Sequence, residues 1–121
     1  MQSKGPKVGV AIRKLAEEEH LPVRDLATNQ FPRIHFEGNF KVKPGETQTD
    51  LKTKCLQLID GLLSYPVAEL MVHPALPDEW LLNNSSYSTQ RVSEYAVLTD
   101  PEIYQYISQA AVTLATFRDL E

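Results

Sequence analysis

Four parts of the chain carry apolar residues at the spacing of an α-helix. The first runs from residue 8 to residue 20, ahead of Pro22, whose ring disfavours helical dihedral angles at the preceding residue. The second is the strongest, because five apolar side chains share one face: Leu51, Cys55, Leu58, Ile59 and Leu62. Thr47 and Asp50 resemble a capping box at the start of this helix.

The other two helical patterns lie in the second half of the chain. In residues 87–98, Val92, Tyr95 and Ala96 fall on one face. Asp100 is a favourable N-cap residue, and Pro101 suits the first helical position. We therefore expect one helix over residues 87–98 and a second that begins at Pro101 and continues to Gln109.

Three short runs have the length and composition of strands: residues 21–26, 67–72 and 112–117. Residues 27–45 show no period and contain Gly and Pro, which predicts a long loop of the kind that is often functional. Helices that alternate with apolar strands indicate a parallel α/β fold. Because about three parallel strands with four helices are few for a complete fold, we interpret residues 1–121 as a single partial α/β domain.

Composition narrows the classes of partner. The net charge is −4 and the sequence has no basic block, which disfavours a nucleic-acid partner. Its single cysteine excludes an internal disulfide and fits a reducing compartment, so we expect a cytoplasmic protein. No apolar run approaches the roughly 18 residues that a membrane-spanning helix requires, so no membrane partner is expected.

His73 and Arg24 are the candidate chemical residues, because functional groups in parallel α/β folds gather at the carboxyl ends of strands. An imidazole can donate or accept a proton near neutral pH, and a guanidinium can hold a carboxylate or phosphate. The alternative for His73 is a structural histidine bonded to loop carbonyls. The alternative for Arg24 is an ion pair with Asp25 or with a neighbouring strand.

The remaining candidate residues have structural explanations. His20 follows three glutamates at a helix end and fits solvated capping there, and His35 fits packing among loop aromatics. Asp78 and Glu79 lie just past His73 and could support it, although solvated loop charges explain both better. Cys55 lies on an apolar helix face and is expected to be a buried small hydrophobe. No pair of histidines has the spacing of a metal site.

Several short motifs occur together in an order that is specific in combination. They are Met-x-His-Pro at 71–74, Ser-Ser-Tyr at 85–87, Gln-Arg at 90–91 with Glu94, Leu-Thr-Asp-Pro-Glu at 98–102 and Phe-Arg-Asp-Leu at 117–120. With these motifs the sequence resembles the C-terminal part of the YdjC-like carbohydrate deacetylases, the chitooligosaccharide deacetylase family. The stretch from Val8 to Leu63 is similar more loosely.

The resemblance implies a distorted (β/α) barrel related to polysaccharide deacetylases, of which this chain would form the C-terminal portion. It implies removal of N-acetyl groups from small amino-sugar oligosaccharides with magnesium or another divalent metal. By position, His73 matches a strand-end histidine of the family, a general acid or oxyanion stabiliser. Arg24 matches an arginine that would contact substrate.

The sequence departs from the family where the metal ligands should lie. It has neither the Asp-Asp motif nor the histidine cluster that bind the metal in the family, so we expect no metal site in this chain. The expectation is a deacetylase fragment that is inactive alone. The alternative is a non-catalytic remnant that serves oligomerisation or sugar binding. A partial parallel sheet would expose strand edges, so we expect a homodimer that covers them.

Overall fold

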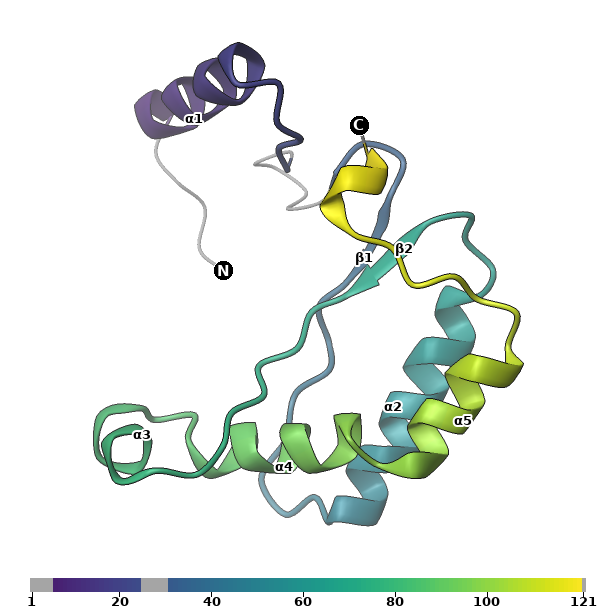
Figure 1. Cartoon of the computed structure of the whole chain (residues 1–121). Coiled ribbons are helices and arrows are strands. Elements are labelled where there is room, and N and C mark those ends of the chain that lie inside the picture. Colours follow the sequence, from purple (N-terminus) through teal and green to yellow (C-terminus); the bar gives the residue numbers. More distant parts are fainter. Residues whose placement is uncertain (1–5, 25–30, 121) are drawn as a thin grey trace.

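The structure is a computed structural model that describes residues 6–24 and 31–120. Five α-helices, two β-strands and one 3-10 helix occur in these residues (Figure 1). In chain order they are α1 (Pro6–Glu18), β1 (His35–Glu37), α2 (Gln48–Leu62), β2 (Ala68–Leu70), α3 (Glu79–Asn84), α4 (Thr89–Leu98), α5 (Pro101–Gln109) and the 3-10 helix η1 (Phe117–Leu120).

The two strands pair in parallel, which confirms the α/β class. His35 lies opposite Ala68, Phe36 opposite Glu69 and Glu37 opposite Leu70. A parallel pair requires a crossover connection, and α2 provides it between β1 and β2. Beyond β2, the amide of Met71 donates to the carbonyl of Glu37 at 2.9 Å, so the pairing extends one residue past β2.

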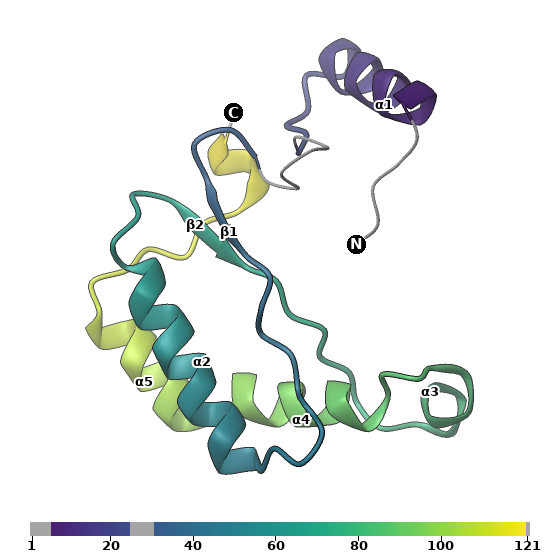
Figure 2. The same cartoon turned by 180° about the vertical axis from the view of Figure 1, so that it is seen from behind.

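The core lies where α2 meets α4, α5 and the two strands (Figure 2). Its fully buried members come from three helices and the segment after β1: Phe40, Leu51, Cys55, Val97 and Ile103. Partly buried side chains of β2 and the residues after it pack against this cluster, including Leu70 and Val72. The helices thereby support the carboxyl end of β2 from one side.

The predicted caps are confirmed in atomic detail. The amide of Asp50 donates to the Thr47 hydroxyl, and the amide of Thr47 donates to the Asp50 carboxylate, each at 3.0 Å. At the start of α5, the Asp100 carboxylate accepts from the amide of Glu102 at 2.8 Å, with Pro101 at the first helical position. These local bonds explain why both helices begin where the sequence predicts.

The strand predictions were right only for residues 67–72, where β2 is shorter than expected. Neither residues 21–24 nor residues 112–117 form a strand, while residues 25–26 lie outside the described part of the chain. β1 occurs instead inside the predicted loop 27–45, so the described residues hold two strands rather than three. Three residues are too few to show a period, and β1 exists because β2 supplies its hydrogen-bond partners.

Helix α3 is not predicted from the sequence, where Asp78 and Glu79 are interpreted as solvated loop charges. The Asp78 carboxylate accepts a hydrogen bond from the amide of Leu81 at 2.6 Å, which makes Asp78 the N-cap of α3. In contrast, the helices predicted over 8–20, 51–62, 87–98 and 101–109 are confirmed as α1, α2, α4 and α5.

Helix α1 lies apart from the rest of the described residues in both views (Figures 1 and 2). Its large apolar side chains are 36–66% exposed: Val8, Val10, Ile12 and Leu15. No helix in residues 6–24 or 31–120 has both the length and the apolar character needed to cross a membrane.

The buried Cys55 thiol should react slowly with alkylating reagents. Burial raises the pKa of Cys55 to about 11, so the reactive thiolate is scarce at pH 8. We expect iodoacetamide labelling, followed by mass spectrometry, to be roughly a hundredfold slower in the native chain than in the same chain in 6 M guanidinium (about that ratio from thiolate fraction alone). Equal rates would show that Cys55 is not buried in solution.

Candidate functional site

His73 lies three residues beyond β2, at the carboxyl end predicted for it. Its position is fixed through the backbone, because the amide of His73 donates a hydrogen bond to Oε1 of Glu94 at 2.7 Å. The side chain is partly exposed and carries no fixed partner in the bonds found among the described residues. The imidazole is therefore held at a defined place while its ring nitrogens stay available to a reacting molecule.

Glu94 on α4 is fully buried and joins three segments of the chain. One carboxylate oxygen accepts from the His73 amide, and the other accepts from the hydroxyl of Tyr87 at 2.5 Å. The Tyr87 oxygen in turn accepts from the amide of Val42 at 2.8 Å. The continuations of both strands are thus tied to α4 through one carboxylate and one phenol.

The energetics of this network favour a fixed geometry. A buried carboxylate is costly unless donors surround it, and each buried donor is costly if its acceptor is removed. Burial, with a smaller contribution from the hydrogen bond to Glu94, raises the pKa of Tyr87 to about 12. The phenol therefore keeps its proton, and continues to donate to Glu94, across the physiological pH range.

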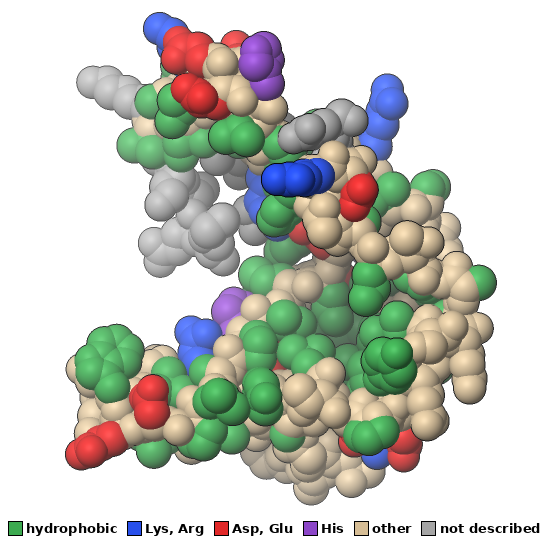
Figure 3. Space-filling view, viewed as in Figure 1, with side chains coloured by type: hydrophobic (Ala, Val, Ile, Leu, Met, Phe, Trp, Pro, Cys, Tyr) green, Lys and Arg blue, Asp and Glu red, His purple; other side chains and the backbone are tan. Residues whose placement is uncertain are grey.

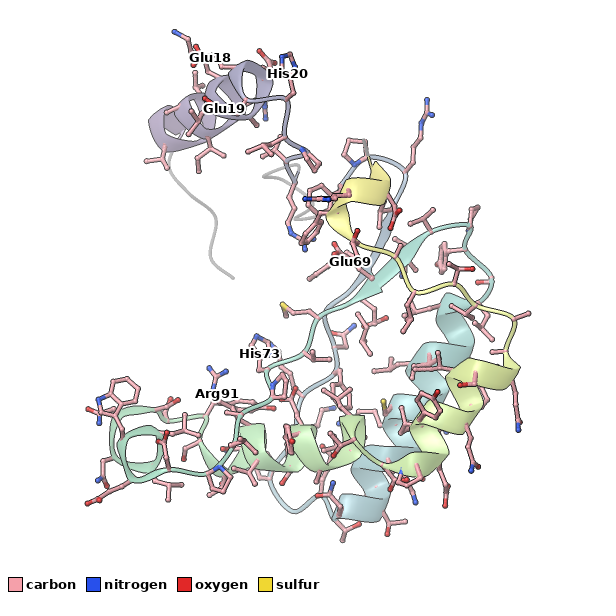
Figure 4. The ribbon with its side chains drawn as sticks, viewed as in Figure 1. Glu18, Glu19, His20, Glu69, His73 and Arg91 are labelled. Atoms are coloured by element: carbon pink, nitrogen blue, oxygen red, sulfur yellow. The ribbon has the colours of Figure 1, made fainter. Side chains whose placement is uncertain are left out.

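The ring of Tyr87 lies close to both His73 and Arg91. The imidazole meets it edge-on, with ring centroids 6.2 Å apart, and the Arg91 guanidinium carbon lies 5.8 Å from its centroid. The Ala75 amide also donates to the Arg91 carbonyl at 3.1 Å, which holds the segment after His73 against the start of α4. His73 and Arg91 consequently lie near each other (Figure 4).

Arg91 is a cation without an anionic partner in the described part of the chain. Its Nε is buried and has no hydrogen-bond partner, and no ion pair to Arg91 occurs among residues 6–24 and 31–120. In the space-filling view, a basic side chain and a histidine side chain meet on the surface at this place (Figure 3). The site therefore presents a guanidinium and an imidazole together.

Arg24 takes the structural alternative foreseen for it. Its guanidinium forms a two-pronged ion pair with Glu69 on β2, with Nη2 at 2.9 Å from Oε2, and lies 4.6 Å from the centroid of the Phe31 ring. A second ring, that of Phe36, lies 5.2 Å away. This pair links the segment after α1 to the sheet. Substrate binding by Arg24 stays a prediction, and it would require the guanidinium to be shared with Glu69.

The other histidines lie outside this cluster. His20 is exposed after α1 with a positive φ of 55°, as suits a helix end. His35 stacks on Tyr65 with ring centroids 3.8 Å apart, which confirms its packing role. No group of three or more His, Cys, Asp or Glu side chains within residues 6–24 and 31–120 could hold a metal ion. The described residues therefore do not fit a metal centre by themselves.

Tyr87, Arg91 and Glu94 occur in the sequence motifs without an assigned role. In the helix predicted over residues 87–98, their spacing of i, i+4 and i+7 would place the three side chains on one face, whereas in the structure α4 begins at Thr89 and Tyr87 precedes it. Glu94 also lies one turn before Val97, which is buried in the core. The position of the Glu94 carboxylate on the same helical face as buried Val97 was therefore the sequence signal that could have predicted a buried polar network.

A family model described as YdjC-like protein matches residues 2–109. The chain belongs to the YdjC-like protein family. Among its curated relatives, a carbohydrate deacetylase from Geobacillus stearothermophilus is 36% identical, with 94% of this chain and 46% of that protein covered. A carbohydrate deacetylase from Listeria monocytogenes serotype 4a is 44% identical, with 94% and 42% covered.

A solved structure agrees with the family assignment. A protein from Enterococcus faecalis V583, which carries the name cellobiose-phosphate cleavage protein, superposes with a TM-score of 0.70 at 26% identity. The superposition covers 93% of this YdjC-like chain and 46% of that chain. The chain thus spans about half the length of the curated relatives that it matches, 46% for the Geobacillus protein.

Removal of the Tyr87 hydroxyl should destabilise the chain. In Tyr87→Phe, the partly buried Val42 amide and one oxygen of the buried Glu94 carboxylate each lose a partner, and we expect the free energy of unfolding to fall by about 1–3 kcal/mol. Urea unfolding followed by circular dichroism measures this change. The matched control is Tyr104→Phe, because Tyr104 is 74% exposed and its change should stay within about 0.5 kcal/mol. Equal effects of the two substitutions would contradict the network.

Proposed function

We propose that this chain supplies part of the active site of a carbohydrate deacetylase, which hydrolyses the amide bond of an N-acetylated amino sugar. Family membership and the names of the curated relatives support this activity. The structural observation that supports this proposal most is the position of His73. It lies just beyond the carboxyl end of a parallel strand, and its backbone amide donates a hydrogen bond to the buried Glu94 carboxylate. We propose the cytoplasm as its location, because a single cysteine fits a reducing compartment.

The proposed architecture of the complete active domain is a distorted (β/α) barrel, with this chain as its C-terminal portion. The parallel strand pair with its crossover helix would form one repeat of such a barrel. The match to 46% of a longer solved chain supports the part of this proposal that makes the chain a portion of a larger fold.

His73 has two proposed roles in amide hydrolysis. Attack of water on the acetyl carbonyl leads to cleavage of the C–N bond, and the departing nitrogen needs a proton. A protonated imidazole at residue 73 donates that proton, or donates a hydrogen bond to the oxyanion that precedes cleavage. Both roles require a ring whose backbone is fixed and whose nitrogens are open, as the structure has it.

We propose that magnesium or another divalent metal takes part, as the family resemblance implies. When bound, such a metal polarises a carbonyl and lowers the pKa of an attacking water. Because the described residues contain no cluster that fits a metal ion, its ligands would come from elsewhere in the active protein.

Replacement of His73 should abolish most of the deacetylase activity. The experiment uses a chimera in which residues 1–121 replace the matching part of the Geobacillus stearothermophilus relative. We expect the parent chimera to release acetate from N-acetylglucosamine oligomers, and the His73→Gln chimera to show kcat reduced by about a hundredfold or more.

Two controls make this result decisive. His35→Gln should leave kcat within about twofold, because His35 stacks on Tyr65 away from the Tyr87 cluster. Circular dichroism should show the same thermal midpoint for the parent and the His73→Gln chimera. A folded His73→Gln chimera with unchanged kcat would return His73 to a structural role. A folded parent chimera with no activity would favour the non-catalytic alternative.

We propose in addition that the 121-residue chain forms a homodimer. Parallel strands are normally paired at both edges and covered on both faces, whereas the described sheet has two strands with α2 on one face. The exposed apolar side chains of α1 add surface that a second copy could cover.

Sedimentation velocity at micromolar concentration tests the dimer, for which we expect twice the 13.7 kDa mass of the chain. Val10→Lys on α1 should shift the population towards monomer, because Val10 is 66% exposed and lysine preserves helix propensity. Glu17→Gln on the same helix is the control and should not shift it. A compact monomer for the unchanged chain would refute the proposal.

A further inference from the structure

β2 and its continuation present two chemically different faces. Leu70 and Val72 pack against the core cluster, so the face that they form is turned towards the helices. In extended backbone, successive side chains point to opposite faces, which places Glu69, Met71 and His73 together on the other face (Glu69 and His73 are labelled in Figure 4). This second face therefore carries a carboxylate, a thioether and an imidazole in a row.

Met71 is the apolar member of this row, and the neighbouring strand adds an aromatic ring beside it. Phe36 is opposite Glu69 in the register, and its ring lies 5.2 Å from the Arg24 guanidinium that Glu69 binds, so it belongs to the same face. Two residues later, a Cβ atom added at Gly38 would lie 3.6 Å from Met71 Cε and 2.9 Å from Phe36 Cε1. The methyl end of Met71 and the edge of the Phe36 ring therefore border the same glycine.

Polar groups stand on either side of Met71 along the chain. Glu69, two residues before it, is neutralised by Arg24. His73, two residues after it, lies about 7 Å farther along extended backbone, and its amide is held by the Glu94 carboxylate. Because Met71 is only half-buried, its methyl end offers apolar surface next to His73 on this face.

We propose that Met71, together with the edge of the Phe36 ring, receives the methyl group of the acyl chain that the deacetylase removes. This inference rests on the proposed function, because it requires the amide carbonyl to lie at His73. In an N-acetyl group, the methyl carbon is bonded directly to the carbonyl carbon. A carbonyl at His73 therefore brings the methyl group towards the apolar side chain beside it, where contact with thioether and aromatic carbon removes the methyl group from water.

The same contact would determine which acyl chains are accepted. A Cβ atom at Gly38 already meets the Phe36 ring at 2.9 Å, so a larger group in that place has to displace the ring. A longer acyl chain meets the same restriction between Met71 and Phe36. One additional methylene in an apolar site typically changes kcat/KM by roughly 10–200-fold. Met71 would thereby favour acetyl over propionyl substrates.

Acyl-chain selectivity in the chimera described above tests this role. The substrates are glucosamine oligomers that carry either N-acetyl or N-propionyl groups, and the released acid is measured. We expect kcat/KM of the parent chimera to be at least about tenfold higher for the acetyl substrate. Met71→Ala removes the thioether and should reduce this preference to about twofold or less, because the space then admits the additional methylene.

Two substitutions serve as controls for Met71→Ala. Met71→Leu conserves volume approximately and should keep the acetyl preference within about threefold of the parent value. Val67→Ala removes apolar surface from the same face of the strand, but four residues before Met71 and farther from His73. Because Val67 is 44% exposed and remote from the reacting group, its replacement should leave the preference unchanged.

Nuclear magnetic resonance of the 121-residue chain detects the contact without catalysis. The sequence has two methionines, so the Cε methyl signal of Met71 is identified by its loss in Met71→Leu. With N-acetylglucosamine at millimolar concentration, we expect a nuclear Overhauser contact between the acetyl methyl group and the Met71 methyl group. Glucosamine, which has no acyl group, should leave the Met71 signal unshifted.

Two results would overturn the role of Met71. One is a folded, active Met71→Ala chimera that keeps the acetyl preference of the parent, and the other is the absence of the methyl–methyl contact. Failure of the proposed function looks different, because a folded parent chimera would then release no acid from either substrate. A methyl–methyl contact in the 121-residue chain would in that case support acyl binding by Met71 without deacetylation, and its absence would overturn both.

Discussion

The buried carboxylate of Glu94 is the constraint on which the site depends. A fully buried carboxylate must find donors, and here the donors are the His73 amide and the Tyr87 hydroxyl. Because Tyr87 also accepts from Val42, the segments after both strands are fastened to α4. The chain therefore cannot alter the position of His73 without leaving buried polar groups unpaired.

In this network, the groups that fix the backbone differ from the groups that could react with a substrate. Glu94 and the Tyr87 hydroxyl are engaged in internal hydrogen bonds, while the imidazole of His73 and the guanidinium of Arg91 lie next to the Tyr87 ring without a side-chain hydrogen bond to this network. Preorganised groups that already hold their positions need no further ordering when a substrate arrives. Arg24 differs from Arg91, because its charge is matched by the carboxylate of Glu69.

The support beneath this network is a small core of three helices against a two-stranded sheet. The core is on one side of the sheet, and α1 lies apart from the other described elements (Figure 2). The curated relatives are about twice as long as this chain, which covers 46% of the Geobacillus protein.

Local sequence determined where α2 and α5 begin, because apolar spacing and capping residues act within a few residues. The capping box of Thr47 and Asp50 and the Asp100–Pro101 helix start are both present in the structure. Sequence order also placed His73 after β2. Only tertiary structure decided that β1 is a strand, since its three residues depend on pairing with β2. Residues 112–117, where Leu114 is 79% exposed, have strand-like composition but find no partner in the described chain. The roles of Tyr87, Arg91 and Glu94 likewise follow from contacts between segments up to 45 residues apart, which no local pattern encodes.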